Sequence, residues 1–129
     1  RTTWPHFSRD ELACRCGRES CPQNGMNVTF MARLEHLRAE LEIPLPVTSG
    51  YRCAAHNAQV SSTGPGGPHT TGRAVDIAIS GESVVTLIGT AIEIGFMGFG
   101  LRQKGPHHGR FVHLDDLAEP FPRPRIWTY

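Results

Sequence analysis

The pattern of apolar and polar residues predicts two main helices. In residues 27–41 the apolar side chains recur at intervals of three or four and would share one face, namely Met31, Leu34, Leu37 and Leu41. Pro44 and Pro46 end this helix. The second helix opens at Ser80 and Glu82 and ends at Gly95, and five of its side chains are predicted to point inward: Val84, Leu87, Ile88, Ala91 and Ile92.

A shorter helix is predicted within the segment HFSRDELAC near the start of the chain. Ser8 can accept a hydrogen bond from the first turn, and Glu11, three residues later, can complete a capping box. Phe7 and Leu12 are spaced for the apolar contact that often accompanies such a cap. Gly17 and the Cys-Pro pair that follows end this helix.

Alternating apolar residues predict the strands. In residues 74–80 Val75, Ile77 and Ile79 alternate with smaller or polar residues, which is typical of a strand with one apolar face. The segments VTSGYR, MGFGL and RFVHLD are further strands, the last two joined through the hairpin loop RQKGPHHG, and the tail PFPRPRIWTY ends in a short strand. Residues 54–73, rich in Gly, Pro and Ser, are predicted to be mostly loop. These elements predict an α+β fold, with the two main helices packed on a small, mostly antiparallel sheet.

Length and charge limit the classes of function. A chain of 129 residues is expected to form a single domain, residues 1–129. The net charge of +1 argues against nucleic acid as the main partner, and no apolar run is long enough to span a membrane. The chain shows no signal-peptide pattern, so a route of export is left open.

Four cysteines form the first candidate site. Cys14, Cys16 and Cys21 are close in sequence, and Cys53 follows later. The three possible states are a structural metal site, two disulfides and reduced thiols. The C-x-C-x4-C spacing differs from paired C-x2-C knuckles, so a structural metal ion is not the favoured reading.

A second candidate site comes from polar residues inside apolar strands. Asp76 interrupts the strand at 74–80, and a buried carboxylate there is costly unless a cation or hydrogen bonds hold it. His113 interrupts RFVHLD in the same way, and His69 precedes Asp76 in a Gly-rich loop. Each residue alone could be an ordinary ion pair or a core histidine. Together they form a set of three ligands suited to catalytic zinc, with a fourth position open for water.

The order of these motifs resembles a known family. The patterns H-x2-G-x-A-x-D, from His69 to Asp76, and F-V-H-x-D, from Phe111 to Asp115, resemble the zinc D-alanyl-D-alanine carboxypeptidases and endolysin peptidases, whose relatives include the hedgehog signalling domain. The segments HFSRDELACRCG, SGYRCAAHN, GFMGFGL and IWTY are also similar to this family. The resemblance implies a hedgehog/DD-peptidase-like fold, and PHTTGRAVDI with HLDD looks most like the phage-encoded peptidoglycan peptidases.

The resemblance also implies roles for individual residues. His69, Asp76 and His113 would be the zinc ligands, and Arg52 would hold a substrate carboxylate or carbonyl or stabilise an oxyanion. An ordinary ion pair at the sheet edge is the alternative for Arg52. Beside these, we expect Ser49 and Tyr51 to line the same cleft, His56 and Asn57 to order a loop, and Trp127 and Tyr129 to close the core beside the cleft.

Two positions depart from the family pattern. Gly67 stands where many relatives have serine, and Arg110 stands where several have the acidic general base. Asp115 shares a strand face with His113 and is the favoured base, with His107 or His108 as the alternative proton shuttle. An orienting hydrogen bond to a ligand imidazole is an equally good role for Asp115.

The sequence thus predicts a zinc-dependent peptidase that hydrolyses an amide bond in peptidoglycan stem or cross-link peptides, of the endolysin or D,D-carboxypeptidase type. The alternative is a catalytically inactive, zinc-stabilised module that binds the cell wall or belongs to a phage particle. We expect a monomer that acts in the periplasm or on the cell wall, with phage lysis or virion delivery as possible routes. Which peptidoglycan bond is cut is not decided by the sequence.

Overall fold

Five strands form one sheet in the computed structural model, which describes residues 4–129. The strands are β1 (Val47–Ser49), β2 (Ala74–Ala78), β3 (Gly98–Arg102), β4 (Phe111–Asp115) and β5 (Arg125–Thr128), in the order β1-β2-β4-β3-β5. The β1–β2, β2–β4 and β4–β3 pairs are antiparallel, as expected for the two strands that flank the 103–110 hairpin loop.

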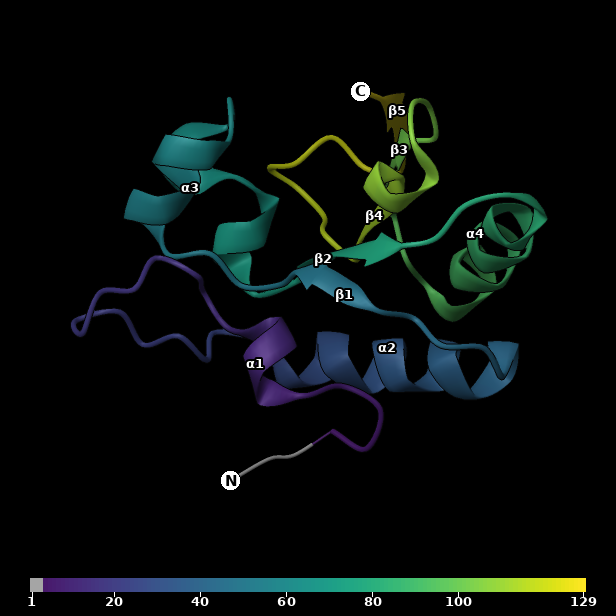
Figure 1. Cartoon of the computed structure of the whole chain (residues 1–129), viewed down its shortest axis with the longest axis horizontal. Helices are drawn as coiled ribbons and strands as arrows, with labels where there is room; N and C mark the ends of the chain where they lie inside the picture. Colours follow the sequence, from purple (N-terminus) through teal and green to yellow (C-terminus); the bar gives the residue numbers. More distant parts are fainter. Residues whose placement is uncertain (1–3) are drawn as a thin grey trace.

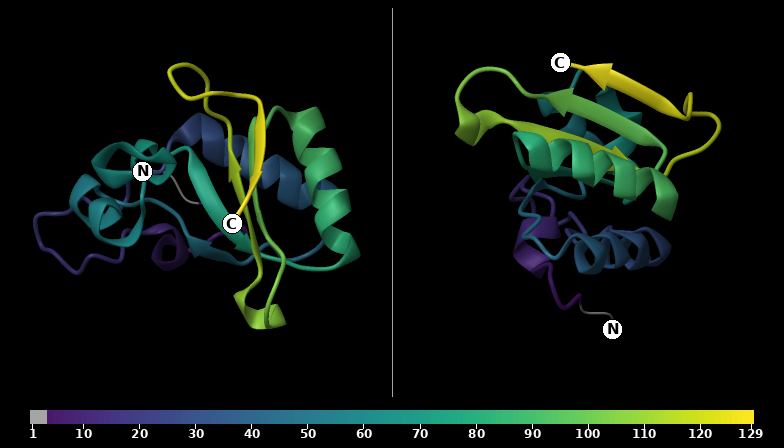
Figure 2. Two further views of the ribbon diagram at one scale, coloured as in Figure 1. Left: turned by 90° about the horizontal axis from the view of Figure 1, so that it is seen from above. Right: turned by 90° about the vertical axis from the view of Figure 1, so that its right-hand side faces the viewer.

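The prediction of a mostly antiparallel sheet needs correction, because β5 runs parallel to β3 and the sheet is mixed. Gly98 at the start of β3 lies opposite both Asp115, the last residue of β4, and Arg125, the first residue of β5. The chain therefore leaves β4 and enters β5 at the same end of the sheet, having passed over β3. Figure 2 shows this connection as the yellow loop before the last strand.

The helices lie on both sides of this sheet. The chain contains α1 (Arg9–Leu12), α2 (Val28–Leu41), α3 (Ala54–Val60) and α4 (Glu82–Ile94), and the short 3-10 helices η1 (Gly64–Gly66), η2 (Pro68–Thr71) and η3 (His107–Gly109). In Figure 1, α2 lies below β1 and β2, whereas α3 lies above them. The two main helices and their bounds agree with the sequence prediction, and no helix of the described residues is long and apolar enough to cross a membrane.

The prediction that residues 54–73 are mostly loop was wrong, since this region contains α3, η1 and η2. Ala54, Ala55 and Ala58 favour the helix intrinsically. The side chain of Asn57, buried on α3, donates to the hydroxyl of Thr63 and to the carbonyl oxygen of Gly64. These bonds hold the Gly- and Pro-rich segment against the helix, which no local apolar pattern reveals.

The predicted cap of the first helix is confirmed. The backbone N–H of Glu11 donates to Ser8 Oγ at 3.1 Å, and the N–H of Ser8 donates to Glu11 Oε1 at 2.7 Å. The other carboxylate oxygen of Glu11 accepts from the N–H of Val47 at 3.1 Å, and the N–H of Tyr51 donates to Leu12 O. The cap residue therefore also attaches α1 to the β1 segment.

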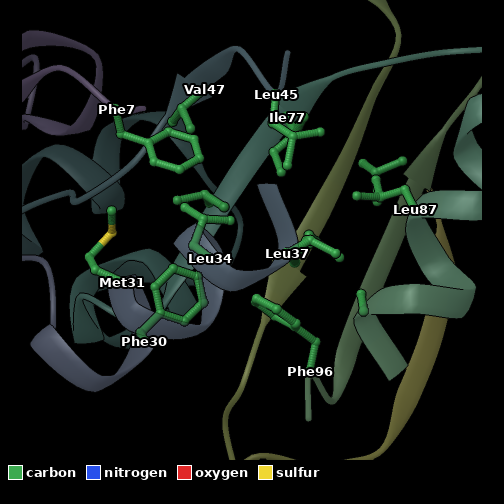
Figure 3. Packing of buried hydrophobic residues seen from close by; sticks show 14 of the residues in the cluster. Phe7, Phe30, Met31, Leu34, Leu37, Leu45, Val47, Ile77, Leu87 and Phe96 are labelled. Carbon is green, nitrogen blue, oxygen red and sulfur yellow. The ribbon is translucent and has the colours of Figure 1, made fainter. Parts of the chain in front are cut away.

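The apolar core lies between the sheet and the two main helices (Figure 3). Its largest buried side chains include Phe30, Met31, Leu34 and Leu37 on α2, Leu87 on α4, and Phe96 before β3. Ile92 was predicted to point inward but is 55% exposed. Val84, Leu87 and Ala91 form the inward face of α4, and the residue after Ala91 is rotated away from it by the helical period.

Strand alternation gives the sheet two different faces. Val75 and Ile77 on β2 and Val112 and Leu114 on β4 belong to the apolar core. Their neighbours in sequence, including Asp76 and His113, point to the opposite face. Asp76 and His113 are direct partners across the β2–β4 pair, so strand register alone brings these two polar side chains together.

Candidate metal centre

Three side chains converge on the face of the sheet opposite the core. His69, on η2, has Nε2 at 3.3 Å from Asp76 Oδ1, and His113 Nδ1 lies 3.2 Å from the same oxygen. One ligand atom of each residue lies within 4.8 Å of the others, and all three residues are buried. This is the set of residues that the sequence proposed as metal ligands.

Each histidine is held through its other ring nitrogen. Nδ1 of His69 is 2.8 Å from Gly50 O, and Nε2 of His113 is 2.7 Å from Asp115 Oδ2. A carbonyl or carboxylate oxygen can only accept, so these nitrogens carry the protons in the neutral imidazoles. The nitrogens that face Asp76 then carry lone pairs. Three acceptors that face one another favour a cation among them, and two imidazoles with one carboxylate are a donor set suited to zinc.

The charges in the centre favour an ionised Asp76. Burial opposes ionisation of its carboxyl group, but hydrogen bonds and charge interactions with His113 and His69 lower its pKa below the usual range. Burial likewise opposes protonation of His113, yet the hydrogen bonds to Asp115 and Asp76 raise its pKa. The site therefore stabilises positive charge at its centre.

Asp115 lies behind His113 and is fully buried. Arg123 Nε and Nη2 donate to its two carboxylate oxygens at 2.9 and 2.8 Å. Nε2 of His113 is hydrogen-bonded to one of the same two oxygens. Although burial disfavours the charged form, Arg123 and His113 lower the pKa of Asp115 to about 2. Its carboxylate contacts the ring nitrogen of His113 that faces away from Asp76, and Asp115 does not line the cavity described below.

Arg52 enters the same centre from the segment between β1 and α3. Its Nε donates to Ser49 Oγ and its Nη1 to Asn57 Oδ1, both at 3.1 Å, while Nη2 lies 3.7 Å from Asp76 Oδ2. Ser49 and Tyr51 were expected to line the cleft, and here the structure differs. Ser49 fixes Arg52 instead, and the Tyr51 ring packs against the backbone at Gly25, so neither side chain reaches the cavity.

Thr63 occupies the space in which a serine at position 67 would place its side chain. A Cβ atom built on Gly67 would collide with the side chain of Thr63 and lie 2.8 Å from Asn57 Nδ2. The hydroxyl of Thr63 already accepts from that amide at 2.8 Å. Thr63, which lines the cavity, therefore places its hydroxyl beside position 67 and leaves no room there for a side chain.

The remaining predicted candidates lie away from the ligands. The guanidinium of Arg110 donates through Nε to Gly105 O at 3.0 Å, within the β3–β4 connection. His107 and His108 lie on η3, are exposed, and are not among the residues that line the cavity. The structure therefore does not bring the two loop histidines to the ligand set.

A cavity of about 740 Å³ opens over the three predicted ligands. Its wall contains three arginines, Arg52, Arg123 and Arg125, and Asp76 is its one carboxylate among the described residues. Four aromatic side chains also contribute to the wall: Phe111, Phe121, Trp127 and Tyr129. The cavity is therefore positively charged, with flat apolar surfaces beside the charges.

Trp127 and Tyr129 belong to this wall and not to the apolar core. The Trp127 ring lies 5.1 Å from the His113 ring between centroids, and the Arg123 and Arg125 guanidinium carbons lie 5.1 and 5.5 Å from the Trp127 ring centre. Sequence reasoning missed both arginines as site residues. In the sequence, Arg123 and Arg125 alternate with prolines before the strand that contains Trp127. This pattern does not show on which side of the sheet the two arginine side chains lie.

The chain was also compared with known proteins. A family model described as Peptidase M15 matches residues 5–115, which include all three predicted ligands. Comparisons with curated proteins and with solved structures gave no match.

Proposed function

The chain belongs to the peptidase M15 family, and we propose that it is a zinc-dependent peptidase that hydrolyses an amide bond in peptidoglycan stem or cross-link peptides. The observation that carries this proposal is the orientation of the two imidazoles. Gly50 O and Asp115 hold their outer nitrogens, so the lone pairs of their inner nitrogens face Asp76. A bound zinc ion would lower the pKa of water toward ~7 and polarise a carbonyl group.

Arg52 is the residue that we expect to hold the reacting part of the substrate. Ser49 and Asn57 fix two of its nitrogens, and the third is near Asp76 and faces the cavity. A guanidinium held in this way can donate to the scissile carbonyl and stabilise the negative charge that develops on its oxygen.

The charge of the cavity supports an anionic peptide as substrate. Arg123 and Arg125 add two positive charges to the wall beside Trp127. Guanidinium groups bind carboxylates well, and peptidoglycan stem peptides carry several free carboxylates. Both arginines are therefore candidates for binding the substrate outside the reacting bond, although Arg123 is already engaged by Asp115.

The structure supports a positioning role for Asp115 more strongly than a role as general base. Its carboxylate is fully buried and engaged by Arg123 and His113. Tyr129 is the candidate proton donor in the cavity wall. Burial raises its pKa, as does the charge of Asp76, so its hydroxyl stays protonated at neutral pH and can donate to the substrate. His107 and His108 remain candidates only if η3 moves toward the cavity.

A phage or cell-wall setting, action outside the cytoplasm and a monomeric state are parts of the same proposal. The setting and the place of action follow from the resemblance of PHTTGRAVDI and HLDD to phage-encoded peptidases and from the family's action on wall peptides. An inactive wall-binding module is the competing function, since Arg110 replaces the usual base and the cavity wall offers no second carboxylate.

Digestion of purified peptidoglycan tests the function. The zinc-loaded wild type should release new peptide ends that mass spectrometry identifies, and a chelator should stop their release until zinc is restored. His113→Ala should lose the ion of this centre and the activity, whereas His36→Ala, at an exposed position on α2, should retain both. Binding of the folded, zinc-loaded protein to the wall without any cleaved peptide would instead support the binding module.

A further inference from the structure

The four cysteines gather into one cluster at the edge of the molecule. The Sγ atoms of Cys14, Cys16, Cys21 and Cys53 all lie within 4.8 Å of one another, and all four thiols are free. Three of them come from the segment that follows α1, and Cys53 immediately precedes α3. The cluster thus joins two parts of the chain that are 32 residues or more apart in sequence, the loop after α1 and the start of α3.

Backbone amides point at these sulfurs. The N–H of Arg18 donates to Cys16 Sγ at 3.4 Å, and the N–H of Cys53 donates to Cys14 Sγ at 3.3 Å. Two of the four sulfurs therefore have an amide donor. Such bonds stabilise the thiolate, which is the form that binds a metal ion.

The segment that carries three of the cysteines has little else to hold it. Residues 15–24 are exposed or only partly buried, and this stretch contributes no side chain to the apolar core. Its backbone bonds are few, among them Cys14 N–H to Gln23 O and Cys21 N–H to Arg18 O. Ordering a loop of this length costs conformational entropy that so few contacts do not offset. A cross-link through the cysteines would supply the missing stabilisation.

We infer that Cys14, Cys16, Cys21 and Cys53 bind a structural zinc ion. Four thiolates around zinc at about 2.3 Å stand roughly 3.8 Å apart, which matches a cluster in which every sulfur neighbours the other three. Two disulfides would instead join the sulfurs in separate pairs. Four soft sulfur ligands exclude magnesium and calcium, and a site closed by four protein ligands is structural and not catalytic.

The position of this site gives it a role in the fold. Cys53 is adjacent to Arg52, and the Tyr51 ring packs against Gly25 at the far end of the cysteine loop. The ion would therefore tie the loop to the segment that presents Arg52 to the cavity. This inference does not depend on the proposed peptidase activity, because none of the four cysteines lines the cavity.

Zinc counting by elemental analysis tests the inference on protein purified in zinc-containing buffer. We expect two ions per chain in the wild type, one in Cys21→Ser and one in His113→Ala. Ser20→Ala changes an exposed neighbour in the same loop and should retain two. If only the His–Asp–His centre fails to bind, the wild type holds one ion, Cys21→Ser holds none, and the inference stands.

Cobalt substitution keeps the test decisive if Cys21→Ser does not fold. Cobalt-loaded wild type and His113→Ala should both show the intense near-ultraviolet absorption of cobalt–thiolate bonds. A wild type without this absorption overturns the inference. Two further results would also overturn the inference. One is the detection of two disulfides by mass spectrometry in protein purified without reductant. The other is an equal zinc count in wild type and Cys21→Ser.

Discussion

At the scale of single residues, the metal centre is shaped by atoms that an ion would not touch. Gly50 O and the carboxylate of Asp115 select the tautomers of His69 and His113, and thereby decide which ring nitrogens are free. Arg52 depends in the same way on Ser49 and Asn57. The supporting residues should therefore be as sensitive to mutation as the proposed ligands themselves.

Arg52→Lys should retain zinc and lose activity. Lysine keeps the positive charge but cannot hold Ser49, Asn57 and a substrate oxygen at once, because it lacks the planar fork of a guanidinium. We expect kcat/KM on a wall peptide to fall about 10–100-fold, or about 1.4–2.8 kcal/mol of transition-state stabilisation. Arg102→Lys, at an exposed position on β3, is the control. An unchanged kcat/KM would move the substrate-holding role to Arg123 or Arg125.

Asp115→Asn separates a positioning residue from a general base. Loss of the carboxylate weakens the bonds to Arg123 and His113, so zinc affinity, measured by competition with a chromogenic chelator, should fall about 10–100-fold. Asp10→Asn, at an exposed position on α1, should not change it. Full zinc affinity with abolished turnover would show that Asp115 is the base after all.

The sequence could indicate the candidate ligands because two of them break a local rule. Asp76 and His113 are polar residues in apolar strands, and their spacing from His69 and Gly72 matches a family motif. Thr63, Arg123 and Arg125 break no such rule. They reach the cavity only through the folding of the segment that follows α3 and the path of the chain from β4 into β5, which short-range patterns do not describe.

At the scale of elements, β3 is shaped to accommodate its neighbours. A Cβ atom on Gly100 would lie 2.7 Å from the Trp127 ring on β5, and one on Gly98 would collide with the Asp115 carboxylate on β4. The parallel β3–β5 pair therefore depends on residues without side chains. The sequence showed that both strands exist, but not that they pair in parallel, because pairing is fixed by the path of residues 116–124.

Gly100→Ala should destabilise the protein by about 1–3 kcal/mol, because Trp127 must shift and the His113 ring rests beside it. Gly89→Ala on α4 is the matched control, since a methyl group there meets no atom and should stabilise the helix by about 0.5–1 kcal/mol. Urea denaturation measures both. Equal stability of the two variants would contradict the proposed packing of β3 against β5.

At the scale of the whole molecule, the sheet separates stability from chemistry. The two main helices and the apolar core occupy one face, and α3, the candidate ligands and the cavity occupy the other. Asp116 connects the layers at the end of β4. It accepts from Arg33 on α2 at 2.6 Å and from Arg73, just before β2, at 2.7 and 2.8 Å.

Asp116→Asn should lower the free energy of unfolding by about 1.5–3 kcal/mol, because the buried carboxylate holds two arginines that are partly exposed. Activity of the folded fraction should persist, since Asp116 does not line the cavity. Glu93→Gln removes an equal charge from an exposed position on α4 and should change stability by less than about 0.5 kcal/mol. Equal effects of the two changes would show that the Asp116 pairs contribute nothing.

The register of β2 and β4 also has a consequence for the order of events during folding. Asp76 and His113 are partners across these strands but 37 residues apart in sequence, with α4 between them. Their site does not exist until the central strand pair has closed, and closing a long connection is slow. Cys14, Cys16 and Cys21 lie within one short loop and can meet early. The chain would therefore acquire sulfur ligands for a metal ion before it acquires the histidine–aspartate set.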